Sequence, residues 1–204
     1  LNDIDAITES FDAVMVARGD LGVEIPAEQV PLAQKQVIEV ADTLGKPVVI
    51  ATQMLESMVN SQTPTRAEVS DVANAIFDGV DAILVTGETA IGKYPVEVIS
   101  TLNRVIQQTE KATDVQRTTL PEEVSKTADA ISHAVCEIAI DLDINAIMTM
   151  THSGSTARMI ARYRPFANVY ALTPFDHIMR QLQLVWGVTP IQVETYKNME
   201  VIPD

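Results

Sequence analysis

Three apolar segments of the chain end in residues that suit the binding of an anion and a metal ion. The first segment, residues 13–17, runs directly into Arg18, Gly19 and Asp20. A glycine lets backbone amides approach a ligand closely, and a carboxylate is the hard oxygen ligand that magnesium prefers. These residues predict a site for a metal-bound anion. A tight turn, in which Asp20 caps the next segment and pairs with Arg18, is the alternative interpretation.

Two further apolar segments end in a similar way. Residues 47–51 lead to Thr52, and residues 81–85 lead to Thr86 and Glu88. Helical patterns follow the three segments, at residues 31–44, 66–77 and 95–108. Strands that alternate with helices form right-handed crossovers in a parallel sheet, and a (β/α)8 barrel builds its active site where its strands end. We therefore expect the three strand ends to share one site.

The second of these helices has clear start and stop signals. Thr65 is followed three residues later by Glu68, which is the spacing of a capping box. In that motif the two side chains satisfy backbone donors that would otherwise be unpaired. Gly79 follows the last apolar position, as is typical of a helix C-terminus.

Taken in order, these segments resemble the pyruvate kinases. The motifs that carry the resemblance are residues 15–22 (MVARGDLG), 51–58 (ATQMLESM), 64–68 (PTRAE), 71–75 (DVANA), 87–90 (GETA) and 94–95 (YP). Thr86 departs from the family pattern, which more often has serine before Gly-Glu-Thr-Ala, although the hydroxyl is retained. The resemblance implies an α/β fold made of the last strands and helices of a (β/α)8 TIM barrel.

The resemblance implies that a phosphoryl group passes from phosphoenolpyruvate to ADP in glycolysis, giving pyruvate and ATP with Mg²⁺ (or Mn²⁺) and K⁺. Asp20 would be a magnesium ligand, and the backbone amides of Gly19 and Asp20 would receive the substrate carboxylate. Thr52 would hold that carboxylate by its hydroxyl and lie near the proton path to the enolate. Thr86 and Glu88 would lie nearer the nucleotide. Phosphoryl transfer depends mainly on positioning and on charge stabilisation, which such groups provide.

The chain is expected to hold only part of that active site. Three strand–helix units are visible, whereas the barrel needs eight strands to close. The resemblance implies that a phosphate-binding arginine, an enolate-stabilising lysine, a second metal carboxylate and the potassium ligands lie upstream, and we assign no residue to them. The chain should therefore be inactive alone. A free-standing, non-catalytic sugar-phosphate-binding protein with the same fold is the alternative from another functional class.

The alternation of strands and helices stops at a polar segment, residues 111–123, which we interpret as a linker. It would separate a partial barrel domain, residues 1–110, from a partial C-terminal α/β domain with a mainly parallel sheet, residues 124–204. The elements expected in the second domain are helices at 125–142, 157–163 and 175–183, and strands at 146–150, 169–172 and 189–193.

A hydroxyl-rich loop in the second domain leads into its second helix. Thr151, Ser153, Gly154, Ser155 and Thr156 form this loop. Unpaired amides and the helix dipole both favour phosphate at such a position. The resemblance implies a phosphate loop for a sugar-phosphate effector. Alternatively, Ser155 or Thr156 merely caps its own helix.

Composition limits the partners and the location of the protein. The formal net charge of −14 disfavours nucleic acid, which is bound through clustered lysine and arginine. No apolar run is long enough to span a bilayer, and no secretion signal is visible, so we expect a cytoplasmic protein. Cys136 lies in an apolar pattern that is typical of a buried thiol rather than a nucleophile. The resemblance implies a homotetramer, with Arg66 and Asp71 at subunit contacts, and a local surface ion pair is the alternative.

Overall fold

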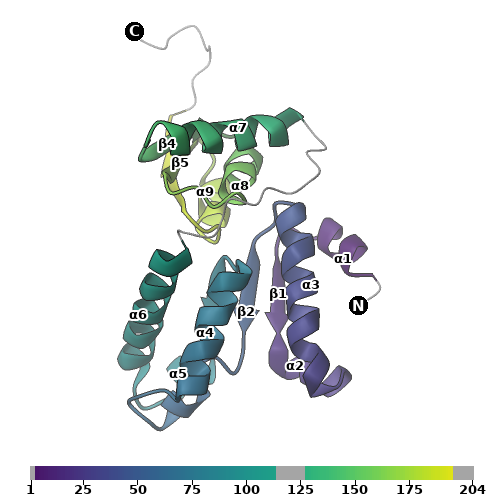
Figure 1. Ribbon diagram of the computed structural model, residues 1–204, viewed down its shortest axis with the longest axis vertical. Coiled ribbons are helices and arrows are strands. Elements are labelled where there is room, and N and C mark those ends of the chain that lie inside the picture. The colour runs from purple at the N-terminus through teal and green to yellow at the C-terminus, as the bar shows by residue number, and fades with distance from the viewer. Residues whose placement is uncertain (1–2, 114–126, 195–204) are drawn as a thin grey trace, which may run out of the picture. The chain divides into compact units, whose positions relative to one another are not determined.

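The computed structural model describes residues 3–113 and 127–194. The chain divides into two compact units, one within residues 1–122 and the other within residues 123–204 (Figure 1). The segment predicted to be a linker, residues 111–123, begins inside a helix that extends to Thr113. The other residues of that segment lie outside the described ones. The same holds for the end of the C-terminal domain beyond residue 194.

A three-stranded parallel sheet organises the first unit. Its strands lie in the order β1 (Val14–Ala17), β2 (Val48–Ala51) and β3 (Ala82–Leu84). Three described helices have more than ten residues, namely α3 (Val30–Thr43), α4 (Arg66–Asp78) and α6 (Pro95–Thr113), and α1 (Ile4–Ser10) has seven. The other helices are α2 (Arg18–Glu24), η1 (Ala27–Gln29), η2 (Glu56–Val59) and α5 (Gly87–Ala90). The predicted alternation of parallel strands and helices is therefore confirmed.

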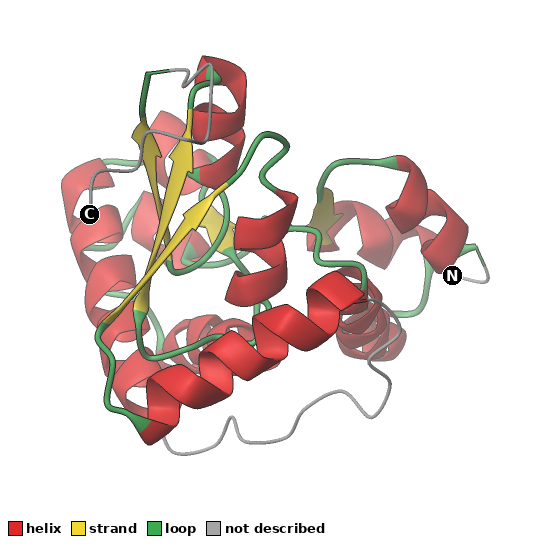
Figure 2. Ribbon diagram, turned by 90° about the horizontal axis from the view of Figure 1, so that it is seen from above, coloured by secondary structure: helices red, strands yellow, loops and turns green. Residues whose placement is uncertain are grey.

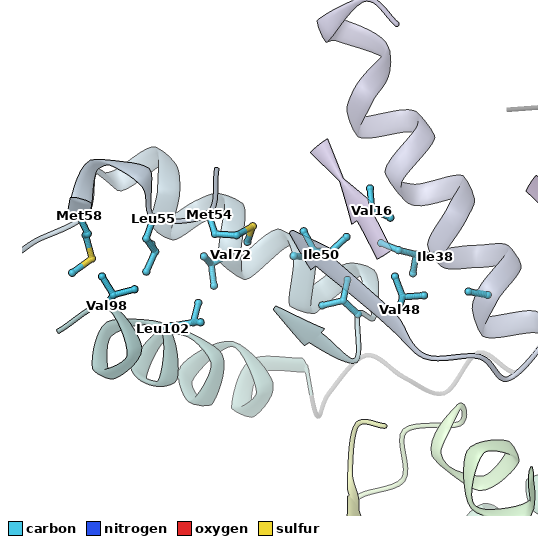
Figure 3. Packing of buried hydrophobic residues seen from close by; sticks show 13 residues of the cluster. Val16, Ile38, Val48, Ile50, Met54, Leu55, Met58, Val72, Val98 and Leu102 are labelled. Atoms are coloured by element: carbon cyan, nitrogen blue, oxygen red, sulfur yellow. The ribbon is translucent and has the colours of Figure 1, made fainter. Parts of the chain in front are cut away.

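The core of this unit lies between the sheet and its helices. Val16, Ile50 and Ile83 are register partners, so they share the face of the sheet that belongs to the core. The cluster also contains Ile38, Val72, Val98 and Leu102 from the surrounding helices (Figure 3). On the opposite face Met15 and Leu84 are 56% and 43% exposed. Within the described residues, this second face of β1 is therefore not covered.

The start of α4 carries the capping box that its spacing predicts. Glu68 N donates to Thr65 Oγ1 at 3.3 Å, and Thr65 N donates to Glu68 Oε2 at 2.7 Å. The same carboxylate also accepts from Ser57 N at 2.7 Å and from Ser57 Oγ at 2.6 Å, which ties η2 to α4. The helix ends at Gly79, whose φ of 96° is left-handed.

These hydrogen bonds affect the acidity of Glu68. Partial burial raises the pKa of Glu68, but the bonds from Ser57 and Thr65 outweigh it and leave the pKa below its ordinary value. A lowered pKa in the folded state means that the ionised carboxylate stabilises the fold. That contribution is fully present above the unfolded-state pKa and is lost as the pH falls through the folded-state pKa.

The second unit has its own parallel sheet, in the order β4 (Ala146–Met150), β5 (Asn168–Thr173) and β6 (Val188–Gln192). Its helices are α7 (Thr127–Asp141), α8 (Ser155–Ala161) and α9 (Asp176–Leu182). Figure 2 distinguishes these strands, in yellow, from the helices, in red. The expected order of helices and strands is confirmed. In the described parts of both units, no helix combines the length and the apolar character that a membrane crossing requires.

We predict that Glu68→Gln lowers the free energy of unfolding by about 1–2 kcal/mol at neutral pH, since the amide replaces a charged acceptor of the cap and of Ser57. The loss should shrink as the pH falls through the lowered pKa of Glu68, where the wild-type carboxylate itself becomes protonated. Urea unfolding followed by circular dichroism measures both values.

Glu97→Gln is the matched control. Glu97 also lies in the first turn of a helix, α6, but it is exposed. Its substitution should cost less than about 0.5 kcal/mol. Equal losses in the two variants would contradict the role assigned to the cap.

Candidate active site

The ends of β1 and β2 meet directly. Ala17 and Ala51 are register partners, so the residues that follow them leave the same edge of the sheet. Gly19 N donates a hydrogen bond to Thr52 Oγ1 at 2.9 Å. Two of the predicted site residues, 33 positions apart in the sequence, are thus in contact. The chain after β1 is a helix rather than a turn, and Arg18, Gly19 and Asp20 form the first turn of α2.

The backbone after β2 adopts an unusual conformation. Thr52 and Gln53 have φ values of 69° and 54°, and both therefore lie in the left-handed region. This region is unfavourable for residues with a side chain, and most of all for a β-branched residue such as threonine. Strain of this kind persists only where the surroundings enforce it, and it is common at functional sites.

Arg18 contacts this strained turn. Its Nη2 donates to the carbonyl oxygens of Thr52 and Gln53, each at 2.9 Å. Its Nη1 forms an ion pair with Asp71 Oδ2 of α4 at 2.6 Å. The alternative interpretation, in which Arg18 pairs with Asp20, is therefore wrong, because the guanidinium extends towards β2 and α4. Asp71 does form an ion pair within the chain, and its predicted place at a subunit contact stays a prediction.

Glu88 joins the loops that follow β2 and β3. Its side chain is fully buried. Oε1 accepts from Leu55 N at 3.1 Å, and Oε2 accepts from Thr86 N at 2.9 Å. A carboxylate with two backbone donors can remain inside the protein because its hydrogen bonds offset the loss of water. The side chain of Thr86 is exposed, so at this strand end Thr86 can reach a ligand while Glu88 holds the backbone.

Asp20 is exposed at the start of α2. Among the described residues, no group of three or more histidine, cysteine, aspartate or glutamate side chains is placed to hold a metal ion. Magnesium, however, is often bound by one or two carboxylates together with water and phosphate oxygens. A single exposed carboxylate therefore fits one ligand of a magnesium site to which a substrate and other protein segments contribute.

The loop between β4 and α8 is closed by its own hydrogen bonds. Thr151 is buried, and its Oγ1 accepts from Gly154 N at 2.8 Å. Gly154 is the N-cap of α8 with a φ of 78°, so the alternative in which Ser155 or Thr156 caps this helix is wrong. Ser153, Ser155 and Thr156 are exposed. Of the predicted phosphate-loop residues, these three present hydroxyls at the surface.

The thiol of Cys136 is not suited to nucleophilic chemistry. It is buried, and it donates to the carbonyl oxygen of Ile160 at 3.7 Å. Burial, with a smaller effect of the Glu137 charge, raises the pKa of Cys136 to about 11. The thiol is therefore protonated at neutral pH, and the interpretation of Cys136 as a packed residue is confirmed.

Two features of the site were not expected from the sequence. One is the contact of Arg18 with Asp71, which lies 53 positions away. The other is the left-handed turn at Thr52 and Gln53. The position of Arg18 immediately after an apolar strand does indicate a side chain that lies beside the neighbouring strand ends, but neither partner is visible in a local pattern.

We predict that Glu88→Gln destabilises the first unit by about 1–3 kcal/mol. The glutamine NH2 group would replace one carboxylate oxygen, so a donor would face one of the two backbone N–H groups and leave it without an acceptor. The free energy of urea unfolding measures this loss. Glu56→Gln is the control, since Glu56 is exposed on η2 and should change stability by less than about 0.5 kcal/mol. A Glu88 variant as stable as the Glu56 variant would contradict the bridging role.

Comparison with known proteins gives matches to one family along both units. Residues 1–99 match the family model of the pyruvate kinase barrel domain, and residues 129–202 match that of the pyruvate kinase alpha/beta domain. Pyruvate kinase from Bacillus licheniformis is 54% identical over 191 residues, which are 92% of this chain and 33% of that protein. Pyruvate kinase 2 from Synechocystis sp. is 51% identical over 199 residues, which are 95% of this chain and 32% of that protein.

A solved structure agrees with these matches. A crystal structure of a pyruvate kinase from Cryptosporidium parvum has a TM-score of 0.89 and 39% sequence identity, and the match covers 98% of this chain and 42% of that one. The chain thus spans about a third of the length of the curated relatives named above. Both units match the family in the order of its domains, and the chain therefore belongs to the pyruvate kinase family and carries part of its barrel domain and of its alpha/beta domain.

Proposed function

We propose that this chain is the part of a pyruvate kinase that binds the carboxylate of phosphoenolpyruvate and supplies one magnesium ligand. The observation that carries the proposal is the 2.9 Å contact between Gly19 N and Thr52 Oγ1, beside the exposed Asp20. It joins a backbone donor and a hydroxyl at the ends of adjacent strands, and the residue next to the donor is an exposed aspartate. The reaction is transfer of the phosphoryl group to ADP, giving pyruvate and ATP.

The hydroxyl of Thr52 can donate a hydrogen bond to the substrate carboxylate. It accepts from Gly19 N, which leaves its own proton to be donated to a ligand. The amide of Asp20 lies in the first turn of α2, where backbone donors lack partners within the helix, and the neighbouring Gly19 amide would share its hydrogen between Thr52 Oγ1 and the ligand. An incoming carboxylate can accept from these groups. In this role the Thr52 hydroxyl would also lie near the proton path to the enolate.

Asp20 would hold Mg²⁺ or Mn²⁺ together with the substrate. When bound, the ion neutralises negative charge on the phosphoryl oxygens. Thr86 would face the nucleotide, and Glu88 would hold the backbone of Thr86 in place. We assign no residue of this chain to K⁺, to the enolate-stabilising lysine or to the second metal carboxylate.

The wider context follows from the family. The chain would be inactive alone and would act within a complete, cytoplasmic enzyme of glycolysis, assembled as a homotetramer. In the second unit we propose that Ser153, Ser155 and Thr156 receive the phosphate of a sugar-phosphate effector. Thr151 and Gly154 would shape that loop through their mutual hydrogen bond.

The role of Asp20 can be tested in a chimera in which this chain replaces the aligned segment of the Bacillus licheniformis pyruvate kinase. We predict that Asp20→Asn lowers kcat/KM for phosphoenolpyruvate by about 100-fold or more, because a charged ligand of the metal is lost. The assay follows pyruvate formation at several magnesium concentrations. Excess magnesium should recover part of the activity.

Asp5→Asn is the matched control, since Asp5 is an exposed aspartate in the first turn of another helix, α1. That variant should keep the activity of the chimera. If the Asp20 variant were equally active, the metal assignment would be incorrect. An inactive chimera that nevertheless binds sugar phosphates would favour the non-catalytic binding protein.

The effector loop gives a separate prediction. Glucose 6-phosphate and ribose 5-phosphate, but not glucose, should raise the Tm of the chain, and a ligand at 100 times its Kd adds about 2.7 kcal/mol. Ser155→Asp should abolish the shift, because its carboxylate repels the phosphate. Thr127→Asp is the control, since Thr127 is likewise the exposed first residue of a helix. A shift that persists in the Ser155 variant would place the phosphate elsewhere.

A further inference from the structure

We propose that Arg18 is a positioning residue whose guanidinium holds Thr52 and Gln53 in the left-handed conformation that keeps the Thr52 hydroxyl at the Gly19 amide. The inference rests on the proposed function, in which that hydroxyl contacts the substrate carboxylate. An arginine next to a site for an anionic substrate is more readily interpreted as a ligand of the anion. The contacts of this side chain give it a different task.

The guanidinium is engaged by the protein itself. Nη1 is paired with Asp71, and Nη2 donates to the carbonyl oxygens of Thr52 and Gln53. The side chain is only 10% exposed. Its Nε is buried and has no hydrogen-bond partner among the described residues. The hydrogen bonds of Arg18 that the described residues show all go to protein groups, which together with its burial favours a structural task over direct contact with a substrate phosphate.

The contacts oppose a specific conformational tendency. Two consecutive residues with side chains, one of them β-branched, occupy the left-handed region, which the free chain avoids. Their carbonyl oxygens both accept from the same nitrogen of Arg18, so the observed turn directs two successive carbonyl groups to one donor. A rotation of Thr52 to an extended conformation would move its carbonyl oxygen away from Nη2.

Asp71 fixes the direction of the guanidinium. It lies on α4, whose start is itself held by the capping box of Thr65 and Glu68. The planar fork of arginine can bind a carboxylate with one nitrogen and two carbonyls with another, whereas lysine presents a single nitrogen. A positive charge alone is therefore insufficient to hold the turn, and we expect Arg18→Lys to lose the turn as Arg18→Gln does.

Gln53 offers a way to separate positioning from other effects. Its side chain is exposed, and the contact with Arg18 uses its backbone carbonyl. Gln53→Gly removes the side chain that disfavours a positive φ and leaves the hydroxyl of Thr52 intact. If Arg18 acts by holding the turn, glycine at this position should compensate in part for its removal.

The first experiment uses the 204-residue chain and needs no activity. NMR couplings between the amide and α protons, together with backbone shifts, report φ at Thr52 and Gln53. Arg18→Gln and Arg18→Lys should shift these residues out of the left-handed region and change the Gly19 amide resonance. Adding Gln53→Gly to Arg18→Gln should restore the Gly19 resonance. A left-handed turn that persists in both single variants would overturn the proposal.

Lys35→Gln is the matched control for this experiment. Lys35 forms an ion pair with Asp78, another carboxylate of α4, but it lies on the surface. Its removal should leave the resonances of Thr52, Gln53 and Gly19 unchanged. If the Lys35 and Arg18 variants perturbed them equally, the effect would be a general loss of helix packing, and the proposal would fail.

The second experiment measures turnover in the Bacillus licheniformis chimera. Arg18→Gln should lower kcat about tenfold or more while the KM for ADP stays the same, and Gln53→Gly should recover part of that loss. When Thr52 is already alanine, adding Arg18→Gln should lower kcat little further, since Arg18 is proposed to act by positioning the Thr52 hydroxyl. Losses that multiply would mean that Arg18 acts independently of Thr52, contrary to the proposal.

The two experiments fail in different ways. If Thr52→Ala left the chimera fully active, the proposed catalytic role of Thr52 would be incorrect, whatever Arg18 does. The NMR measurement would still decide whether Arg18 holds the turn. If the turn depended on Arg18 but kcat did not, the residue would be structural, and its role as a positioning residue for the reaction would be rejected.

Discussion

Parallel strand register is the constraint on which the candidate site depends. Ala17, Ala51 and Leu84 are successive register partners across β1, β2 and β3, so the chain leaves the sheet three times at one edge. Without this alignment, Gly19 and Thr52 could not form a hydrogen bond across 33 positions of sequence. The apolar faces of the helices that pack on one face of the sheet fix the register, because a slip by one residue would expose the buried face.

Once the strands have ended, side chains replace the hydrogen bonds that regular structure would provide. Backbone groups in a loop need partners as much as those in a sheet do. Arg18 donates to two carbonyl oxygens after β2, and Glu88 accepts from two backbone amides in the loops after β2 and β3. Glu68 joins η2 to α4 in the same way. Ionised groups suit this task because each can bind several backbone groups at once.

Periodicity and short motifs were sufficient to predict the strands, most helices and the capping box of Thr65, because each depends on neighbours within a few residues. They failed for α2, since Arg18, Gly19 and Asp20 were interpreted as a ligand loop or a tight turn rather than a helical turn. They also missed the partner of Arg18, because Asp71 is brought near only by the folded sheet. The left-handed Thr52 runs against local preference, so a prediction from propensity cannot find it.

The loops that follow β2 and β4 contain the same kind of hydrogen bond but place the left-handed residue differently. In each, a threonine that follows a strand accepts a hydrogen bond from a glycine amide, namely Thr52 from Gly19 and Thr151 from Gly154. In the second unit the positive φ falls on Gly154 itself, where it is favourable. In the first it falls on Thr52, and the same residue that bears the strain presents the hydroxyl. Glycine there would remove both the strain and the hydroxyl, so the turn of the first unit has a strained residue beside Arg18. The loop of the second unit also receives an arginine, since Arg158 Nη2 donates to the carbonyl oxygen of Ser153 at 3.0 Å, but its positive φ lies on a glycine and costs little.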